Sequence, residues 1–433
     1  MAFKIAIIGA GPVGCMLARL LVKDGLDVTV FEADESPNYR SQGGSLDLHT
    51  DTGLKALKRA DLFDQFLKHA RYDGQYMMLA DKTLSSTFVL GGSTIMQKIE
   101  ERPEIDRALL RQILAESLPK DCIRWGYKLK CVAETDTGKT LVFNNGHEDS
   151  SFDYIVGAEG AWSKVRAFLA PSLKPASSGL AYLSFSIPDA AKTTPETYSI
   201  VNRGNLFVYG DRMSQSHQQM GDGSINLSFI WHEENPEWYK PEVGGMDTTN
   251  GDVMRRFVLD KTAGWHEKMH AAIRSSQGSS QARTLYELPV GVQWEHKPGV
   301  TIIGDAAHLM TPFAGEGVNV GLEDAMLLAE SILAAVKKAG EGQVKETVDA
   351  AVAECETKMF PRIKRYMQLT QDMKMATLFT DEPLESMVQN IMGIIFRDNV
   401  PAGFHPLVTA GVSMFFTGRK VVNWGLRALR GKQ

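Results

Sequence analysis

The hydrophobic pattern at the start of the chain predicts a strand, a tight turn and a helix. Residues 3–8 are an apolar run that ends at glycine, which is typical of a strand buried on both faces in a parallel sheet. Residues 13–24 have helical periodicity and are followed by Gly25, and residues 28–31 form a second apolar run. These segments predict a βαβ unit. Glycines interrupt the first apolar stretch, which argues against a secretory signal peptide.

The middle of the chain changes to alternating hydrophobic and polar positions. Tyr, Phe, Ile and Ser alternate there between turns such as Gly221-Asp222-Gly223, which predicts an antiparallel sheet. The strands expected in this sheet are 76–90, 181–187, 197–209 and 224–231.

Helical periodicity dominates the remaining segments. Helices are expected over 52–70, 105–118 and 318–339, and a short buried strand over 153–157. The pattern of strand, turn and helix returns at 300–305. From residue 346 onward the pattern is helical, with breaks expected near Pro383, near Gly393 and over 401–406.

The first turn carries the sequence Gly9-Ala10-Gly11-Pro12-Val13-Gly14. Glycines at these positions allow the tight turn, the close approach of backbone to a pyrophosphate, and close packing of helix on strand. The phosphate would lie at the positive end of the helix. Glu32 follows Gly14 by 18 residues, where a carboxylate can accept hydrogen bonds from ribose hydroxyls. The motif predicts a dinucleotide site without distinguishing FAD from NAD.

A second glycine-rich segment spans 304–319 and contains Gly304-Asp305-Ala306-Ala307-His308. This segment resembles the aromatic-hydroxylase flavoproteins, the class A flavin monooxygenases. The resemblance implies that Asp305 binds the ribityl chain of FAD. It also implies that a turn and a helix N-terminus lie against the pyrimidine end of the flavin, where backbone N–H groups stabilise negative charge. The residues implied at this end are Pro312, Gly315, Glu316, Gly317, Val318 and Asn319.

The fold class expected from these patterns is α/β. A Rossmann-like FAD-binding domain is expected from 1–70, 101–175 and 295–340. An interleaved antiparallel-sheet, substrate-binding domain is expected from 71–100 and 176–294. Residues 341–433 are expected to form a C-terminal helical region.

A third motif, over 153–166, contains Glu159-Gly160 where the family usually has Asp-Gly. In the family this segment is associated with both FAD and NAD(P)H. The alternative is a strand-to-helix turn in which Ser163 caps the helix. The sequence leaves both interpretations open.

The segment Gly43-Gly44-Ser45-Leu46-Asp47-Leu48-His49 narrows the resemblance to the tetracycline-inactivating flavin monooxygenases. On matching positions, it implies that Asp47, Arg107 and Arg111 contact FAD and that Arg40 contacts NADPH. A guanidinium at Arg111 can form a forked pair with a pyrophosphate. A solvated surface ion pair is the alternative for each arginine. His49 is expected to be structural or to pack on the flavin.

Substrate contacts are expected on the sheet and at the second glycine-rich turn. Ser184 and Asn226 stand where the tetracycline enzymes use glutamine and histidine to hold the drug, which argues against tetracycline itself. The resemblance instead implies a small planar aromatic or polyketide-like substrate. Phe185, Asn226, Pro312 and Phe313 are the candidate contacts, and core packing is the alternative for any of them.

Composition narrows the class of partner and cofactor. The chain has 47 Lys and Arg against 52 Asp and Glu, and a net charge of −5 argues against nucleic acid as the main partner. The four cysteines lack C-x-x-C spacing, and no metal-ligand spacing is found, so no metal site is predicted. Free thiols favour a cytoplasmic location. His217 is expected in an exposed loop.

The end of the chain combines apolar and basic residues. Residues 407–416 are apolar, and a basic stretch with interleaved Val, Trp and Leu follows. Its charged residues are Arg419, Lys420, Arg427, Arg430 and Lys432. This pattern is typical of an interfacial amphipathic helix and is compatible with peripheral membrane contact. The alternative is a helix docked on the protein with a hydrated basic face.

The resemblance implies a monooxygenase that uses FAD, NADPH or NADH, and O2. The flavin, through a C4a-hydroperoxide, would insert one oxygen atom into the substrate, so no catalytic side chain is predicted. The chain is expected to act as a monomer. A flavin oxidase or reductase on the same fold and a non-catalytic flavin-binding sensor are the alternatives. The Trp-x-Trp-x-Ile-Pro signature of flavin halogenases is absent from the sequence.

Overall fold

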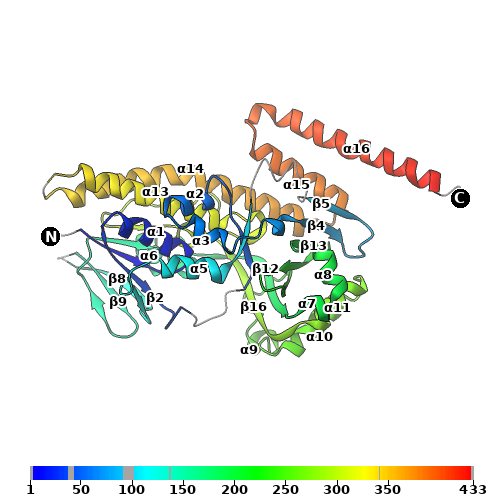
Figure 1. Cartoon of the computed structure of the whole chain (residues 1–433), viewed down its shortest axis with the longest axis horizontal. Coiled ribbons are helices and arrows are strands. Elements are labelled where there is room, and N and C mark those ends of the chain that lie inside the picture. The colour runs from blue at the N-terminus through cyan, green and yellow to red at the C-terminus, as the bar shows by residue number, and fades with distance from the viewer. Residues whose placement is uncertain (1–2, 38–42, 91–101, 136–137, 341, 431–433) are drawn as a thin grey trace.

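A five-stranded parallel sheet forms the first half of the molecule (Figure 1). The computed structural model describes residues 3–37, 43–90, 102–135, 138–340 and 342–430, with the backbone alone for 279–280 and 418–430. The strand order is β17-β11-β1-β2-β7, and all four pairings are parallel. The strands are β1 (Lys4–Ile8), β2 (Asp27–Glu32), β7 (Ile123–Trp125), β11 (Tyr154–Gly157) and β17 (Val300–Ile302).

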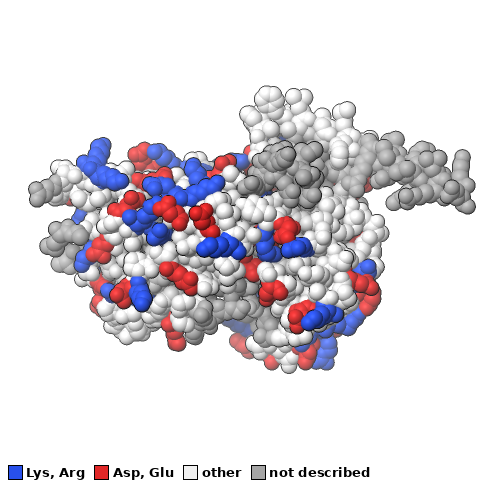
Figure 2. Space-filling model, in the orientation of Figure 1, with Lys and Arg blue, Asp and Glu red and all other residues white. Residues whose placement is uncertain are grey.

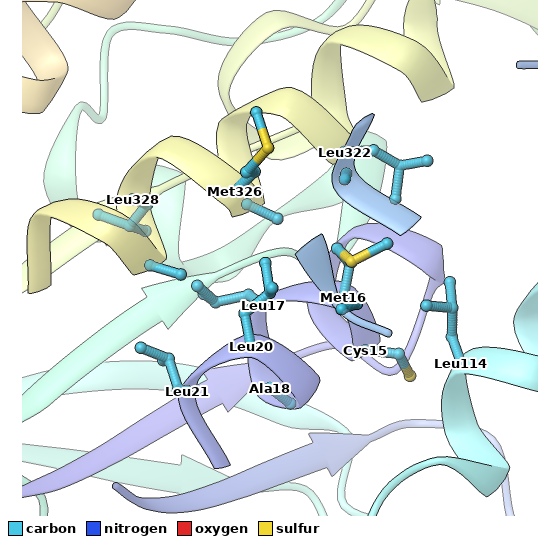
Figure 3. Packing of buried hydrophobic residues seen from close by; sticks show 14 of the residues in the cluster. Cys15, Met16, Leu17, Ala18, Leu20, Leu21, Leu114, Leu322, Met326 and Leu328 are labelled. Carbon is cyan, nitrogen blue, oxygen red and sulfur yellow. The ribbon is translucent and has the colours of Figure 1, made fainter. Parts of the chain in front are cut away.

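Three helices bury one face of this sheet: α1 (Pro12–Lys23), α5 (Arg107–Glu116) and α13 (Gly317–Lys338). Figure 3 shows Leu17 and Leu21 of α1 directed at Met326 and Leu328 of α13, and Leu114 of α5 next to Cys15 of α1. Because α1 carries apolar residues at helical spacing, it can pack on both the sheet and α13.

The opposite face of the sheet carries smaller elements. A three-stranded antiparallel sheet and a short helix pack there around Phe31, Phe143 and Leu169. These elements are β8 (Leu129–Thr135), β9 (Gly138–Phe143), β10 (Glu148–Asp149), η2 (Gly160–Trp162) and α6 (Lys164–Leu169). The sequence pattern did not predict this small sheet.

The second half of the molecule is a seven-stranded sheet of order β16-β12-β15-β14-β13-β4-β5. Its strands are β4 (Met77–Asp81), β5 (Thr87–Leu90), β12 (Ala176–Ile187), β13 (Asn205–Gly210), β14 (Met213–Gln219), β15 (Ile225–His232) and β16 (Gln277–Glu287). Helices cover one face: α7 (Ala190–Thr193), α8 (Pro195–Val201), α10 (Gly251–Lys261) and α11 (Glu267–Ser275). The short helix α9 (Pro241–Gly244) precedes α10 and has no buried residue.

Short elements connect the two halves. The two-stranded pair β3–β6 lies between them, and a glycine-rich segment leads from β17 into α13. The connecting elements are β3 (Ser45–Asp47), β6 (Glu104–Asp106), α2 (Gly53–Arg59), α3 (Phe63–Leu67), η1 (Tyr72–Gln75), α12 (Asp305–His308) and η3 (Pro312–Ala314).

Long helices end the chain. They are α14 (Val344–Leu378), α15 (Leu384–Asp398) and α16 (His405–Arg430), with η4 (Ala402–Phe404) before the last. In Figure 1, α14 runs along α13, and α16 projects away from the rest of the molecule. Among the residues that the structure describes, no helix has the length and apolar character needed to cross a membrane.

The predicted α/β fold class is confirmed, and several element predictions are corrected. Residues 195–201 form α8, not a strand, because Pro195 starts a helix that ends at Asn202 with φ 47°. The helix expected over 52–70 is divided into α2 and α3 at Asp61, whose φ is 57°. Gly393 lies inside α15 and does not break it.

Candidate functional site

The turn between β1 and α1 has the geometry of a phosphate-binding loop. Gly9 has φ +105°, and a Cβ there would lie 2.6 Å from the Ala158 carbonyl oxygen. A Cβ at Gly14 would lie 2.0 Å from the Gly9 carbonyl oxygen, so only glycine permits this close packing of α1 on the turn. Around Gly11, by contrast, no described atom lies within 4 Å of an added Cβ. Pro12 opens the helix, whose N-terminus favours an anion.

Buried charged side chains form hydrogen bonds with the backbone of this turn. Glu32 accepts hydrogen bonds from the backbone N–H groups of Ala10 (2.6 Å) and Asp34 (2.9 Å). Arg111, from α5, donates to the Ala10 carbonyl (3.0 Å) and to the Asp34 carboxylate (3.0 Å). Its third nitrogen, Nη1, is buried without a hydrogen-bond partner among the described residues. An oxygen of a phosphate or ribose would satisfy this donor, which therefore fits the predicted dinucleotide.

The second glycine-rich turn meets the first at Val13. A Cβ at Gly304, whose φ is +60°, would lie 3.2 Å from the Val13 methyl groups. The Asp324 carboxylate is fully buried and holds the turn by accepting from the Gly304 N–H (3.0 Å) and pairing with His308 (2.6 Å). Arg166 donates to the Ala306 carbonyl (2.9 Å). These contacts leave the Asp305 side chain exposed beside the first turn, where a ribityl hydroxyl can reach it.

Arg107, the first residue of α5, lies close enough to Asp305 to feel the charge of its carboxylate. Its side chain is exposed, yet desolvation by the surrounding protein lowers the pKa of its guanidinium, against the charge of Asp305, which raises it. The charge of Arg283, on β16 of the seven-stranded sheet, lowers the pKa of Arg107 further, so Arg107 lies near the second half of the molecule.

The segment from Asp47 to Thr52 is fastened to the N-terminus of α13. Asn319 is fully buried; its amide donates to the Asp47 carbonyl (2.9 Å) and accepts from the His49 N–H (2.9 Å). The Gly315 turn has φ +70°, and a Cβ there would lie 3.6 Å from Asp47 Oδ1. The side chain of Asn319 therefore acts in assembling the site, while Gly317 and Val318 present the first turn of the helix.

His49 joins two carboxylates at this position. Its Nε2 lies 3.0 Å from Asp47 Oδ2, and its Nδ1 lies 3.4 Å from Glu316 Oε2. Burial by itself lowers the pKa of His49, but the hydrogen bonds and charges of Asp47 and Glu316 raise it to about 9. Burial raises the pKa of Asp47, but the hydrogen bond and charge of His49 hold it below its ordinary value. These contacts give His49 a structural role, and packing on the flavin, the other role expected from the sequence, stays a prediction.

The face of the seven-stranded sheet that turns away from α10 and α11 has small polar side chains at its centre. Ser184, Ser228 and Ser216 are cross-strand neighbours on β12, β15 and β14, and the last two hydroxyls lie 2.6 Å apart. Asn226 lies on the same face, and its Oδ1 is 3.8 Å from the position of a Cβ on Gly43. Phe313 contacts this face through the cluster that includes Ile230.

Phe185 does not share this face. Successive side chains of a strand point to opposite faces, and Phe185 packs in the core beneath α10 and α11 with Leu183 and Leu227. Its predicted role as a substrate contact is therefore corrected to core packing. His217, expected in an exposed loop, is fully buried on β14, where burial lowers its pKa to about 4.

The third motif forms the predicted capped turn. The Ser163 hydroxyl accepts from the Arg166 N–H (2.8 Å), and the half-buried Glu159 accepts from the Val165 N–H (2.9 Å). The capping interpretation is confirmed, and a role of this motif toward NAD(P)H stays a prediction. Arg40 lies outside the described residues. Sequence reasoning missed Asp34 and Gln218; the latter accepts from the Ser45 N–H (2.8 Å) and joins the sheet to the site.

The two glycine-rich turns, the exposed aspartate and the helix N-termini of α1 and α13 together define a flavin dinucleotide site. Comparison with known proteins agrees. Residues 2–359 match the family model described as FAD binding domain. The chain belongs to this family of FAD-binding flavoproteins, and the predicted likeness to class A flavin monooxygenases is confirmed.

Named relatives cover most of the chain. Monooxygenase penA of Penicillium thymicola is 30% identical over 412 residues, which cover 85% of this chain and 94% of the relative. Monooxygenase asqM of Emericella nidulans is also 30% identical, with the same coverage of both chains. Among solved structures, Klebsiella pneumoniae HpxO complexed with FAD and uric acid has a TM-score of 0.71 at 17% identity, covering 95% of this chain and 96% of that one. Tetracycline destructase Tet(55) has a TM-score of 0.67 at 18% identity, covering 92% and 97%.

Proposed function

We propose that this chain is an NAD(P)H-dependent monooxygenase that uses FAD and O2 to insert one oxygen atom into a small planar aromatic or polyketide-like molecule. Bound FAD would supply the redox chemistry: it accepts hydride and activates O2. The observation that carries the proposal is the order of the groups along the site. The site begins at the Gly11 turn, continues past the exposed Asp305 and reaches the Gly315 turn. Beside this last turn is the sheet face that carries Ser184, Ser216 and Ser228, which we call the serine-lined face.

Each end of the site has its own task in this proposal. Arg111 and the N-terminus of α1 hold the phosphates, and Asp305 binds the ribityl hydroxyls. The N-terminus of α13, at Gly317 and Val318, stabilises negative charge on the flavin. Arg107, which is exposed near Asp305, would also bind FAD.

The serine-lined face would orient the substrate. Ser184, Ser216 and Ser228 have small side chains, and their hydroxyls can donate or accept hydrogen bonds. Asn226 lies on the same face as these serines. Pro312 and Phe313, from the turn before α13, would supply an apolar wall of the substrate site. Hydroxyl and amide groups fit the ring oxygens of a planar polar substrate. The similarly folded Klebsiella pneumoniae HpxO was solved with uric acid, which is a planar polar molecule of this kind.

The test is a coupling measurement with the FAD-loaded protein. NADPH oxidation, H2O2 release and oxygenated product are measured together across a panel of planar phenols, quinolones and polyketides. The proposal expects one substrate that speeds NADPH oxidation while product replaces H2O2. Release of H2O2 alone with every substrate would identify an oxidase or reductase. Failure of NADPH to bleach the bound flavin would favour the sensor alternative.

A further inference from the structure

The last helix, α16, is docked on the protein along one side only. Val412 and Phe416 are buried against α15 and β5, and the Phe88 and Phe416 rings lie 5.9 Å apart. The amide of Gln389 on α15 donates to the Ser413 hydroxyl (3.2 Å). Positions 412 and 416 are one helical turn apart, so they form a single inner stripe. The docked alternative predicted from the sequence thus describes the inner side of the helix.

The other side of α16 presents large apolar side chains to solvent. Leu407 is 68% exposed, Met414 75% and Phe415 58%, and we call these three residues the outer face. They recur at helical spacing of seven and eight residues, so they lie along one stripe. Phe396 and Phe404, which precede the helix, are 47% and 56% exposed. In Figure 2 the described part of this region is white, whereas charged side chains are spread over the body that carries α13 and α14.

The charge of this end of the chain differs from that of the rest. The segment 399–433 contains five of the 47 Lys and Arg residues and none of the 52 Asp and Glu residues. The remainder of the chain is therefore net acidic, while this segment is basic and apolar at once. Figure 1 shows the C-terminal part of α16 extending clear of the other elements.

These observations favour one occupant for the outer face. A second copy of this chain would bring an equal positive charge to the contact, which opposes association. An anionic bilayer offers an apolar boundary for Leu407, Met414 and Phe415 and negative headgroups for the basic residues. Because no described helix can cross a membrane, the contact would be at the surface of the bilayer. We propose that α16 lies on the surface of an anionic bilayer, with its outer face inserted among the lipids.

Vesicle flotation with the FAD-loaded, full-length protein tests this proposal. Binding is compared between vesicles of phosphatidylcholine alone and vesicles that also contain phosphatidylserine. The outer-face variant carries Leu407→Ser, Met414→Ser and Phe415→Ser. A matched control carries Leu67→Ser, Val243→Ser and Val290→Ser, three hydrophobic residues that are 41%, 44% and 37% exposed elsewhere on the molecule. Retained flavin absorbance and circular dichroism show that both variants are folded.

The expected result is binding that requires phosphatidylserine, weakens with salt and falls at least about tenfold in the outer-face variant but not in the control. Replacing Arg419, Lys420, Arg427 and Arg430 by Gln should weaken binding by on the order of a hundredfold. The proposal is overturned if the intact protein does not bind either vesicle, or if the outer-face variant binds as well as the control. A dimer in light scattering that only the outer-face variant dissociates would identify a second copy as the occupant, and would also overturn it.

Discussion

At the residue scale, Arg111 has two nitrogens engaged with the protein and a third, Nη1, that fits the cofactor. Arg111→Lys keeps the positive charge beside Glu32 and Asp34 but removes the planar guanidinium, whose separate nitrogens can donate to different partners. We expect FAD affinity to fall by roughly tenfold or more, with a smaller loss of apoprotein stability. Titration of apoprotein with FAD, followed by quenching of flavin fluorescence, measures this change.

Two further variants bracket that result. Arg111→Met would leave two buried carboxylates without their partner and should cost about 3–5 kcal/mol of unfolding free energy. Arg59→Lys changes an exposed ion pair with Glu330 and should leave FAD affinity unchanged. Equal FAD affinity in Arg111→Lys and the intact protein would mean that Nη1 does not bind the dinucleotide.

His49 predicts how the stability of the apoprotein depends on pH. Its pKa is about 9 in the folded protein and 6.5 as the ordinary value, because Asp47 and Glu316 favour the protonated ring. A raised pKa stabilises the fold fully below pH 6.5, and this contribution is lost as pH rises through about 9. We expect the intact protein to lose about 1–3 kcal/mol across this window relative to His49→Gln. Urea unfolding at several pH values gives the difference, and parallel pH profiles for the two proteins would refute the assignment.

At the element scale, two glycines of the β1–α1 turn have different roles: Gly14 is needed for packing and Gly11 for binding the cofactor. Gly14→Ala would push a methyl group against the Gly9 carbonyl and should destabilise the apoprotein by about 1–3 kcal/mol. Gly11 has φ −72° and open space around it, so Gly11→Ala should change apoprotein stability by less than about 0.5 kcal/mol. Its FAD affinity should nevertheless fall by at least about tenfold, because the pyrophosphate approaches the backbone there.

Thermal unfolding of both apoproteins and FAD titration of both variants distinguish these two roles. If Gly11→Ala binds FAD normally, the dinucleotide does not approach this turn. If Gly14→Ala is as stable as the intact protein, the close contact with Gly9 does not constrain the turn.

The two faces of the seven-stranded sheet are also expected to differ in role, one binding the substrate and the other packing in the core. Asn226→Ala, on the serine-lined face, should raise the KM for substrate while leaving substrate-free NADPH oxidation unchanged. Phe185→Leu, on the core face, should cost about 1 kcal/mol of stability and leave the KM unchanged. Steady-state kinetics with melting curves test both, and a KM effect from Phe185→Leu alone would place the substrate on the other face.

The sequence contained the information for this face assignment, but only in part. In β12, Tyr182, Ser184 and Ser186 alternate with Leu183 and Phe185, so the two-residue period separates the faces. By this period Phe185 and Asn226 lie on opposite faces of the sheet, so they cannot both contact the substrate. The apolar face could be recognised as core only once α10 and α11 were known to cover it. Those helices were missed because their short apolar patterns lie between turns.

The motifs were more predictable than the contacts behind them. Glycine at 9, 14 and 304 follows from local backbone demands that the sequence displays directly. The partners Asp34 of Arg111 and Asp324 of His308 could not be predicted, because the residues of each pair meet only after the sheet and helices have assembled. The Thr, Tyr and Ile residues of α8 favour a strand by their intrinsic preference, whereas Pro195 at its start favours a helix.

At the scale of the whole molecule, distant parts of the chain form one site. β1, β11 and β17 are hydrogen-bonded neighbours, which brings the first turn beside Asp305. Asn319 fastens α13 to the segment that follows β3, and Gln218 fastens the seven-stranded sheet to Ser45. These hydrogen bonds therefore fix the position of the turn before α13 relative to the sheet face that carries Ser184, Ser216 and Ser228. This relation is what an oxygen transfer from flavin to an oriented substrate requires.

The most direct test of this account is the fate of isotopically labelled O2. The FAD-loaded protein is given NADPH and the substrate that best stimulates NADPH oxidation, under labelled O2, and the product is analysed by mass spectrometry. The account predicts a product that has gained one labelled oxygen atom, with the second atom released as water. A product without the label, or label found only in H2O2, would contradict it.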